Sequence, residues 1–171
     1  MRRRALIGPF AAAAAAVVAG CGFELRRTPE MSFQTIALTG FAPRSPLAEE
    51  LRRTLGSRVK VVDTPDRADV VLHVLLDRRE RSVVASTASA QVRELQLRLR
   101  FHFQLTNPGG RELAPVAELL LSRDMIYSET VALAKAQEEA ELFAAMQTDV
   151  VQQVARRLAQ LKLQAPRSAA S

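Results

Sequence analysis

Apolar and polar residues alternate most regularly between Leu95 and Leu105. Every odd-numbered position in this stretch is apolar, and every even-numbered position is polar. Side chains of a β-strand point alternately to the two faces of a sheet, so this pattern predicts a long strand with one buried and one solvated face. The Asn-Pro-Gly-Gly sequence at residues 107–110 predicts a turn that ends the strand.

Other strands are predicted from shorter runs. Residues 70–76 are apolar except for one histidine, which favours a central, buried strand. The small and polar residues 83–91, between this run and the long strand, predict a hairpin tip. Further strands are expected at residues 33–38, 59–62 and 116–127.

Two helices are predicted. Ser45 followed by Pro46 is typical of an N-cap and a first helical residue, leucines then recur at every fourth position, and Gly56 closes the helix. The second helix is expected from about Thr130 to Leu161, where apolar residues recur every three or four positions. This predicted stripe consists of Leu133, Ala136, Ala140, Phe143, Met146, Val150, Val154, Leu158 and Leu161.

The order of predicted elements is strand, helix, four strands and helix. Each helix has one apolar stripe, and the sheet has one clean polar face, so both helices are expected to cover the other face. The predicted fold class is α+β, a two-layer sandwich of a mixed sheet of about four to five strands with two helices packed on one face. Residues 32–163 are expected to form this single domain.

Residues 1–20 have the features of a secretory signal peptide. Three arginines follow the first Met, residues 6–18 form an apolar run of thirteen residues, and Ala19 and Gly20 are small. A membrane-spanning helix needs about 20 apolar residues, so this run is too short for one.

The only cysteine, Cys21, follows directly. Residues 18–21, Val-Ala-Gly-Cys, resemble the cleavage box of bacterial lipoproteins, in which the cysteine thiol carries a diacylglycerol and the chain is cut before it. The alternative is a small buried cysteine behind an ordinary signal peptide. By the same resemblance, a residue other than Asp at position 22 implies export to the outer membrane. Residues 21–31 are then a lipidated tether, and residues 164–171 are expected to be a disordered tail.

The charge balance gives little reason to expect a nucleic-acid partner. The full chain has a net charge of +6. Removal of the three arginines at positions 2–4 leaves 21 basic and 18 acidic residues, a net charge of +3. The basic character therefore belongs partly to the signal peptide.

Candidate catalytic chemistry is sparse. His73 and His102 each lie within a strand run, without the spacing of a catalytic triad, and the acidic loop at residues 63–69 lacks the glycine and final glutamate of a calcium loop. No catalytic residue, metal site or cofactor is expected, apart from the covalent lipid on Cys21. The chain is therefore predicted not to be an enzyme.

Several arginines are grouped in a way that suggests a charged surface. They occur at the end of the run at residues 70–76 and on the polar side of the long strand. The set contains Arg78, Arg79, Arg81, Arg98 and Arg100. It is either an ordinary solvated face or a patch for an anionic partner, such as lipid phosphates or an acidic protein wall.

Two segments resemble a known family. Residues 21–26, Cys-Gly-Phe-Glu-Leu-Arg, are similar to the CGxxLR opening of the LptE family of lipopolysaccharide-assembly lipoproteins. Residues 126–135, which end in Ala-Leu-Ala-Lys and lead into an acidic helix, are similar to its C-terminal region. The resemblance implies a non-enzymatic lipoprotein in a one-to-one complex with the large outer-membrane β-barrel LptD. Such a protein plugs the barrel and helps it assemble, binds lipopolysaccharide and assists its delivery to the outer leaflet.

The resemblance also implies site residues. Lys135 matches a family lysine implicated in lipopolysaccharide binding, although it is also placed to pair with Glu138 or Glu139. A second basic site of the family falls at residues 86–91, which contain no arginine here, and Arg93 is the nearest basic residue. The alternative function is a periplasm-facing lipoprotein subunit of another envelope-assembly complex.

Overall fold

The computed structural model describes residues 31–163. The predicted signal peptide, Cys21, most of the tether and the tail lie outside these residues. The described elements follow in chain order: β1 (Thr35–Thr39), α2 (Pro46–Gly56), β2 (Lys60–Val62), the 3-10 turn η1 (Pro65–Arg67), β3 (Val70–Ser86), β4 (Val92–Thr106), β5 (Glu112–Ile126), the 3-10 turn η2 (Glu129–Val131) and α3 (Ala132–Gln160).

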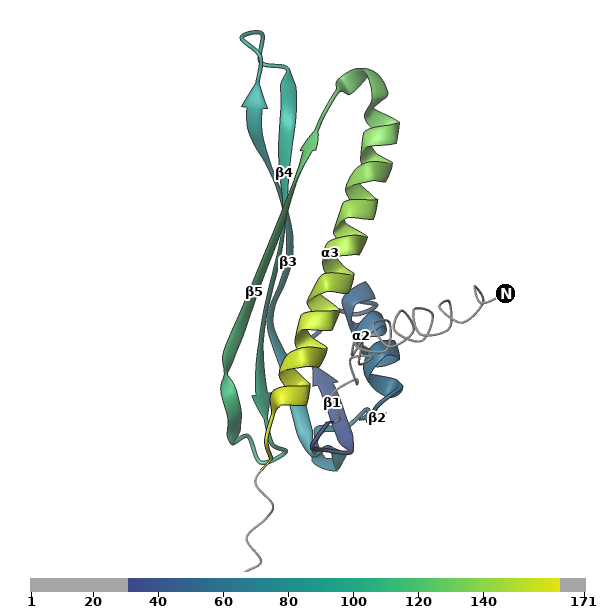
Figure 1. The fold of residues 1–171 in the computed structure, drawn as a ribbon, viewed down its shortest axis with the longest axis vertical. Helices are drawn as coiled ribbons and strands as arrows, with labels where there is room; N and C mark the ends of the chain where they lie inside the picture. Colours follow the sequence, from purple (N-terminus) through teal and green to yellow (C-terminus); the bar gives the residue numbers. More distant parts are fainter. Residues whose placement is uncertain (1–30, 164–171) are drawn as a thin grey trace, which may run out of the picture.

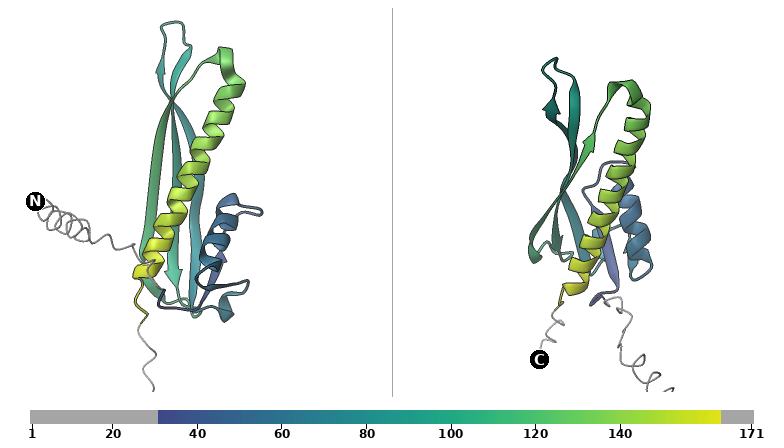
Figure 2. Two further views of the ribbon diagram at one scale, coloured as in Figure 1. Left: turned by 45° about the vertical axis from the view of Figure 1, so that its right-hand side comes forward. Right: turned by 45° about the horizontal axis from the view of Figure 1, so that its top comes forward.

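The five strands form one mixed sheet in the order β2-β1-β3-β4-β5 (Figure 1). The short β1 pairs in parallel with both β2 and β3, whereas β3, β4 and β5 form a long antiparallel meander. Both helices pack on one face of the sheet (Figure 2). The other face is open along the meander, whereas beside β1 it is covered by a small cluster of Ala37, Ala68 and Val71. The predicted α+β sandwich is therefore confirmed.

Strand β4 lies at the centre of the meander and carries the predicted alternation. All six of its apolar odd-numbered positions from Leu95 to Leu105 are buried beneath the helices. Phe101 is fully buried, and its ring stacks against Phe41 and Phe103 with centroid separations of 6.2 and 5.5 Å. This row forms the centre of the main core.

Helix α2 has the predicted bounds. The hydroxyl of Ser45 accepts a hydrogen bond from the backbone N–H of Ala48 at 3.3 Å, and Pro46 occupies the first helical position. The stripe that starts at Leu47 is buried against the sheet and α3.

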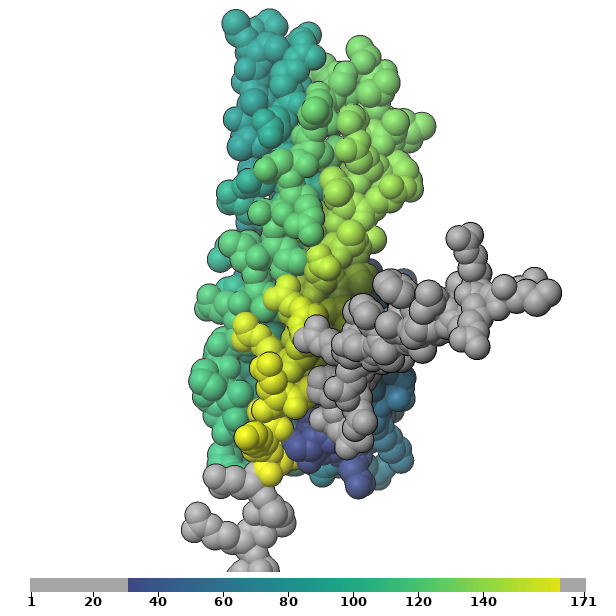
Figure 3. Space-filling view, in the orientation of Figure 1, coloured from purple at the N-terminus to yellow at the C-terminus, as the bar shows by residue number. Residues whose placement is uncertain are grey.

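Helix α3 contains 29 residues and is about 43 Å long. From Phe143 onward its predicted stripe is buried, but Ala136 and Ala140 are exposed, and the exposed fraction of Leu133 is 87%. The predicted stripe is therefore buried from Phe143 onward and exposed in its first turns. They extend beyond the packed core, toward the end of the molecule that carries the β3–β4 turn (Figure 3).

Strand β3 is longer than predicted, and the set of its residues that faces the helices changes along its length. It continues to Ser86, so residues 83–86 belong to the strand, and the tip is a tight turn closed by a hydrogen bond from the Thr87 N–H to the Gln91 carbonyl. A β-bulge at Leu75 adds one residue opposite β4. Even-numbered residues face the helices before the bulge, and odd-numbered residues face them after it.

Within the described residues, no helix is both long and apolar enough to cross a membrane.

Candidate functional site

Lys135 lies in the first turn of α3. Its ammonium Nζ lies 2.7 Å from a carboxylate oxygen of Glu138, and the exposed fraction of its side chain is 19%. Of the two predicted roles of Lys135, the ion pair with Glu138 is thus formed, which leaves the ligand role as a proposal. The N-cap residue, Val131, makes no side-chain capping bond, so the first N–H groups of α3 add to the positive potential around the lysine.

Arg93 lies at the start of β4, near the hairpin tip. Its guanidinium donates to the side chain of Gln91 at 3.4 Å, and its backbone carbonyl accepts a hydrogen bond from the Tyr127 N–H at 2.8 Å. The structure gives Arg93 and Lys135 separate polar partners. Both nevertheless lie at the same end of the molecule, where the hairpin tip and the start of α3 are found (Figures 1 and 2).

The same end exposes large apolar side chains. Ile126, at the end of β5, has an exposed fraction of 75%, and Leu133 lies two residues before Lys135. Val83 and Val84, near the hairpin tip, and Val131, before α3, are about half exposed. A basic residue among exposed apolar side chains is suited to a ligand that has both anionic and apolar parts.

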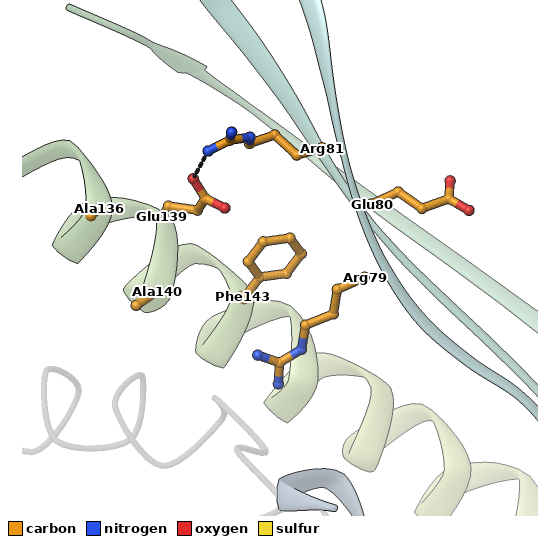
Figure 4. Close-up of a pocket in the computed structure, with 7 residues that line it drawn as sticks. All are labelled: Arg79, Glu80, Arg81, Ala136, Glu139, Ala140 and Phe143. Atoms are coloured by element: carbon orange, nitrogen blue, oxygen red, sulfur yellow. Dashed lines mark hydrogen bonds and ion pairs between the residues drawn. The ribbon is translucent and has the colours of Figure 1, made fainter. Parts of the chain in front are cut away.

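A cleft of about 540 Å³ lies between β3 and α3. Arg79 and Arg81 reach into it from β3, and Phe143 and Glu139 reach into it from α3, while Glu80 points away (Figure 4). Arg81 bonds to Glu139 at 3.3 Å, and the Arg79 guanidinium lies 5.4 Å from the centre of the Phe143 ring. The other lining residues are Ala136 and Ala140. One of them, Ala136, directly follows Lys135 in the sequence.

Polar side chains hold the two helices to β3 at the lower end of this cleft. Arg79 donates to the Gln147 side chain at 2.7 Å, and Gln147 donates to Glu50 of α2 at 2.6 Å. Thr148 donates to the second oxygen of Glu50 at 2.8 Å. Gln147 is buried, so this network satisfies groups that would otherwise be costly to bury.

The arrangement of Arg79 and Arg81 was not predicted from the sequence. Residues 77–82, Asp-Arg-Arg-Glu-Arg-Ser, are polar at every position, so alternation cannot assign a face to any of them. The bulge at Leu75 then decides which of them face the helices. The predicted arginine set is therefore divided: Arg79 and Arg81 lie on the helix side, and Arg78, Arg98 and Arg100 lie on the open face.

Comparison with known proteins identifies the family. A sequence profile of the family described as LptE, lipopolysaccharide-assembly, matches residues 33–158. The chain belongs to the LptE family. A protein of Pectobacterium atrosepticum named LPS-assembly lipoprotein LptE is 32% identical over 146 residues, which cover 83% of this chain and 78% of the relative. A Yersinia enterocolitica protein of the same name is 31% identical over 146 residues, which cover 83% of this chain and 70% of the relative.

Solved structures share the LptE architecture seen here. The solution structure of an uncharacterized lipoprotein B from Nitrosomonas europaea superimposes with a TM-score of 0.70 at 30% identity, over 81% of this chain and 90% of that one. The crystal structure of a rare lipoprotein B from Shewanella oneidensis superimposes with a TM-score of 0.64 at 25% identity, over 74% of this chain and 95% of that one. The chain is thus an LPS-assembly lipoprotein of the LptE family.

The histidines and the acidic loop have local structural contacts in this LptE domain. His73 Nδ1 lies 3.0 Å from the hydroxyl of Thr39, and His102 is half-buried on the open face, opposite Glu118. Among residues 31–163, no three His, Cys, Asp or Glu side chains are grouped so that they could hold a metal ion.

Asp69 joins the start of β1 to the start of β3. Its carboxylate accepts hydrogen bonds from the backbone N–H groups of Gln34 and Thr35 at 3.0 and 2.9 Å. Burial by itself raises the pKa of Asp69, but the hydrogen bonds from Gln34 and Thr35 outweigh it and hold the pKa below its usual value. The ionised carboxylate therefore stabilises the fold.

Replacement of Asp69 should make stability less dependent on pH in acid. A carboxyl group with a lowered pKa stabilises the native state above its unfolded pKa of about 3.9, and this contribution is lost as the pH falls through the native value. Because the group is largely exposed, we expect Asp69→Ala to cost only about 1 kcal/mol at pH 7 and less at pH 3, measured by chemical denaturation. Asp66→Ala, in the same loop, is the control. An equal cost of Asp69→Ala at both pH values would contradict this role.

Proposed function

We propose that the chain is a non-catalytic, lipid-anchored protein of the outer membrane that plugs an LptD-type β-barrel in a one-to-one complex and helps it assemble. In this proposal it also binds lipopolysaccharide and assists its delivery to the outer leaflet. The observation that carries the proposal is the family match across residues 33–158, which spans nearly the whole described domain.

The structure supports the plug role by its shape and surface. The long meander and α3 make a narrow, elongated body (Figure 3), and the open sheet face carries many charged and polar side chains. The lumen of an outer-membrane barrel is polar, so a plug needs a compact core and a polar outside.

The lipopolysaccharide role is supported by the end of the molecule that carries Lys135. An ion pair between residues three apart on a helix, such as Lys135–Glu138, contributes about 0.2–0.5 kcal/mol, so a lipid phosphate would replace Glu138 at little cost. The exposed Ile126 and Leu133 offer apolar surface for acyl chains. Arg93 is the proposed second basic residue.

Purification from native outer membranes tests the proposal. A tagged full-length chain, extracted in detergent, should bring with it one very large β-barrel protein in a one-to-one ratio, identified by mass. A chain that purifies alone would contradict the plug role. Recovery of a different envelope complex would favour the alternative of a subunit in another assembly.

Charge reversal at Lys135 should weaken lipopolysaccharide binding. Loss of a charge-assisted contact of about 1.5 kcal/mol predicts about tenfold weaker retention of lipopolysaccharide by Lys135→Asp, and a further loss when Arg93→Asp is added. Lys162→Asp, which makes the same charge change beyond the other end of α3, is the control. Thermal stability and barrel recovery should stay near those of the wild type. Equal retention by the double variant and the wild type would remove both residues from the site.

Cys21 carries the lipid anchor in this proposal. Because the acyl chains are attached through its thiol, Cys21→Ser should take up no label when cells are grown with a radioactive fatty acid, whereas the wild type should be labelled. The residue lies outside the described part of the chain, so this prediction rests on the sequence. Label on the serine variant would contradict the lipoprotein assignment.

A further inference from the structure

Three arginines gather at the centre of the open sheet face. Arg78 of β3 lies directly opposite Arg100 of β4, and Arg98 lies two residues from Arg100 on the same strand, opposite Glu80. We call Arg78, Arg98 and Arg100 the arginine cluster. Residues two apart on a strand share a face and lie about 7 Å apart, so the three guanidinium groups occupy one small area.

The arginine cluster carries more positive charge than its neighbours neutralise. Like charges directly opposite each other on paired strands destabilise a sheet. Glu80 lies 3.9 Å from Arg78 and 3.5 Å from Arg100, so a single carboxylate serves both. Arg98 donates to the neutral side chain of Gln96 at 2.7 Å. The exposed fractions of the Arg78 and Arg100 side chains are 61% and 42%, so both remain accessible to a partner.

The surroundings of the arginine cluster favour a protein partner over a lipid headgroup. Leu120 of β5 pairs with Arg100 on the same face, and its exposed fraction is 66%. Glu118 and Asp124 on β5 bound the patch on two sides along that strand. Arginines beside an exposed apolar side chain on a broad sheet surface match the composition of protein interfaces, where arginine is a frequent hot-spot residue.

The occupant must carry carboxylates. A second copy of this chain would present the same positive cluster and would be repelled. The segments outside the described structure are unsuitable, because residues 1–30 contain five arginines and two glutamates, and residues 164–171 contain one arginine and no acid. Arginine forks match carboxylates in two-bond geometry, so an acidic protein wall is complementary to the cluster.

We propose that the arginine cluster is a docking surface for a carboxylate-bearing wall of a partner protein. This inference rests on the function proposed above, in which the partner is the barrel and the wall is its inner surface. The cluster sets the side of the plug that faces that wall.

The test compares matched variants of the tagged full-length chain, purified from native outer membranes. Arg78→Gln with Arg100→Gln should retain about tenfold less barrel per chain than the wild type, with the difference seen at low salt and lost as salt rises. Arg78→Lys with Arg100→Lys keeps the charge but not the fork, and should be intermediate. Arg52→Gln with Arg156→Gln, at exposed helix positions, makes the same charge change and should retain the barrel fully.

Two further readouts separate the possible results. The thermal midpoint of the Gln double variant should equal or exceed that of the wild type, because the like-charge pair is gone, and its binding to lipopolysaccharide vesicles should be unchanged. Full barrel retention by this variant would overturn the docking surface and leave the proposed function standing. Loss of vesicle binding with full barrel retention would make the cluster a lipid site and overturn the proposal. If the wild type retains no barrel, both proposals fail.

Discussion

Phe101→Ala should lower the free energy of unfolding by about 3–5 kcal/mol, because it deletes a fully buried ring at the centre of the core. The ring stacks on Phe41 and Phe103, so two further aromatic contacts are lost. The cavity would lie between the sheet and the helices, where close packing prevents the surroundings from collapsing to fill it. Chemical denaturation measures the loss.

Arg100→Ala, one residue away, is the control. Its side chain is on the open face, and its contact is a partly exposed ion pair with Glu80 at 3.5 Å. Such pairs contribute little, so the expected cost is below about 0.5 kcal/mol. Similar losses for Phe101→Ala and Arg100→Ala would show that the alternation along β4 does not determine burial.

Gly40→Ala should cost about 3 kcal/mol. Gly40 follows β1 with a φ of +81°, a conformation that costs other residues about 1 kcal/mol or more. A Cβ there would also lie 2.5 Å from the backbone carbonyl oxygen of Val74 in β3. Relief of that contact must move one strand away from the other, which adds an overpacking cost of about 1–3 kcal/mol.

Two other glycines separate the cost of a positive φ from the cost of the close contact with β3. Gly110 has a φ of +79° but open space around it, so Gly110→Ala should cost only about 1 kcal/mol. Gly56 ends α2 with neither constraint, so Gly56→Ala should be neutral or slightly stabilising. Thermal unfolding of the three variants should follow this order. Equal midpoints for the Gly40 and Gly110 variants would show that contact with β3 is unimportant.

Much of the fold could be predicted because the spacing of apolar residues shows which side of a strand or helix is buried. Alternation along Leu95–Leu105 and the leucine stripe after Pro46 both report which side of an element meets the core, and both were correct. The second half of β3 could not be predicted in this way. Its pairing with β4 uses backbone hydrogen bonds, which form whether or not the side chains alternate.

The candidate site also has parts that could be predicted from the sequence and parts that could not. Lys135 was found through a family resemblance, and its pairing with Glu138 follows from helical spacing. The cleft between β3 and α3 depends on residues that are far apart in the sequence, such as Arg81 and Glu139, which are 58 positions apart and which no local pattern connects. An apolar stripe shows what a helix can bury, but not where the helix leaves the sheet, so the pattern does not mark the exposed start of α3.

The bulge at Leu75 has a consequence for the comparison of relatives. Because one extra residue in β3 exchanges the side chains of its two faces, a homologue that lacked it would place the counterparts of Arg78 and Glu80 against the helices and those of Arg79 and Arg81 in solvent. An alignment with a gap placed a few residues away would hide that exchange. Substitutions between residues 76 and 83 can therefore be interpreted across species only where the extra residue has been located first.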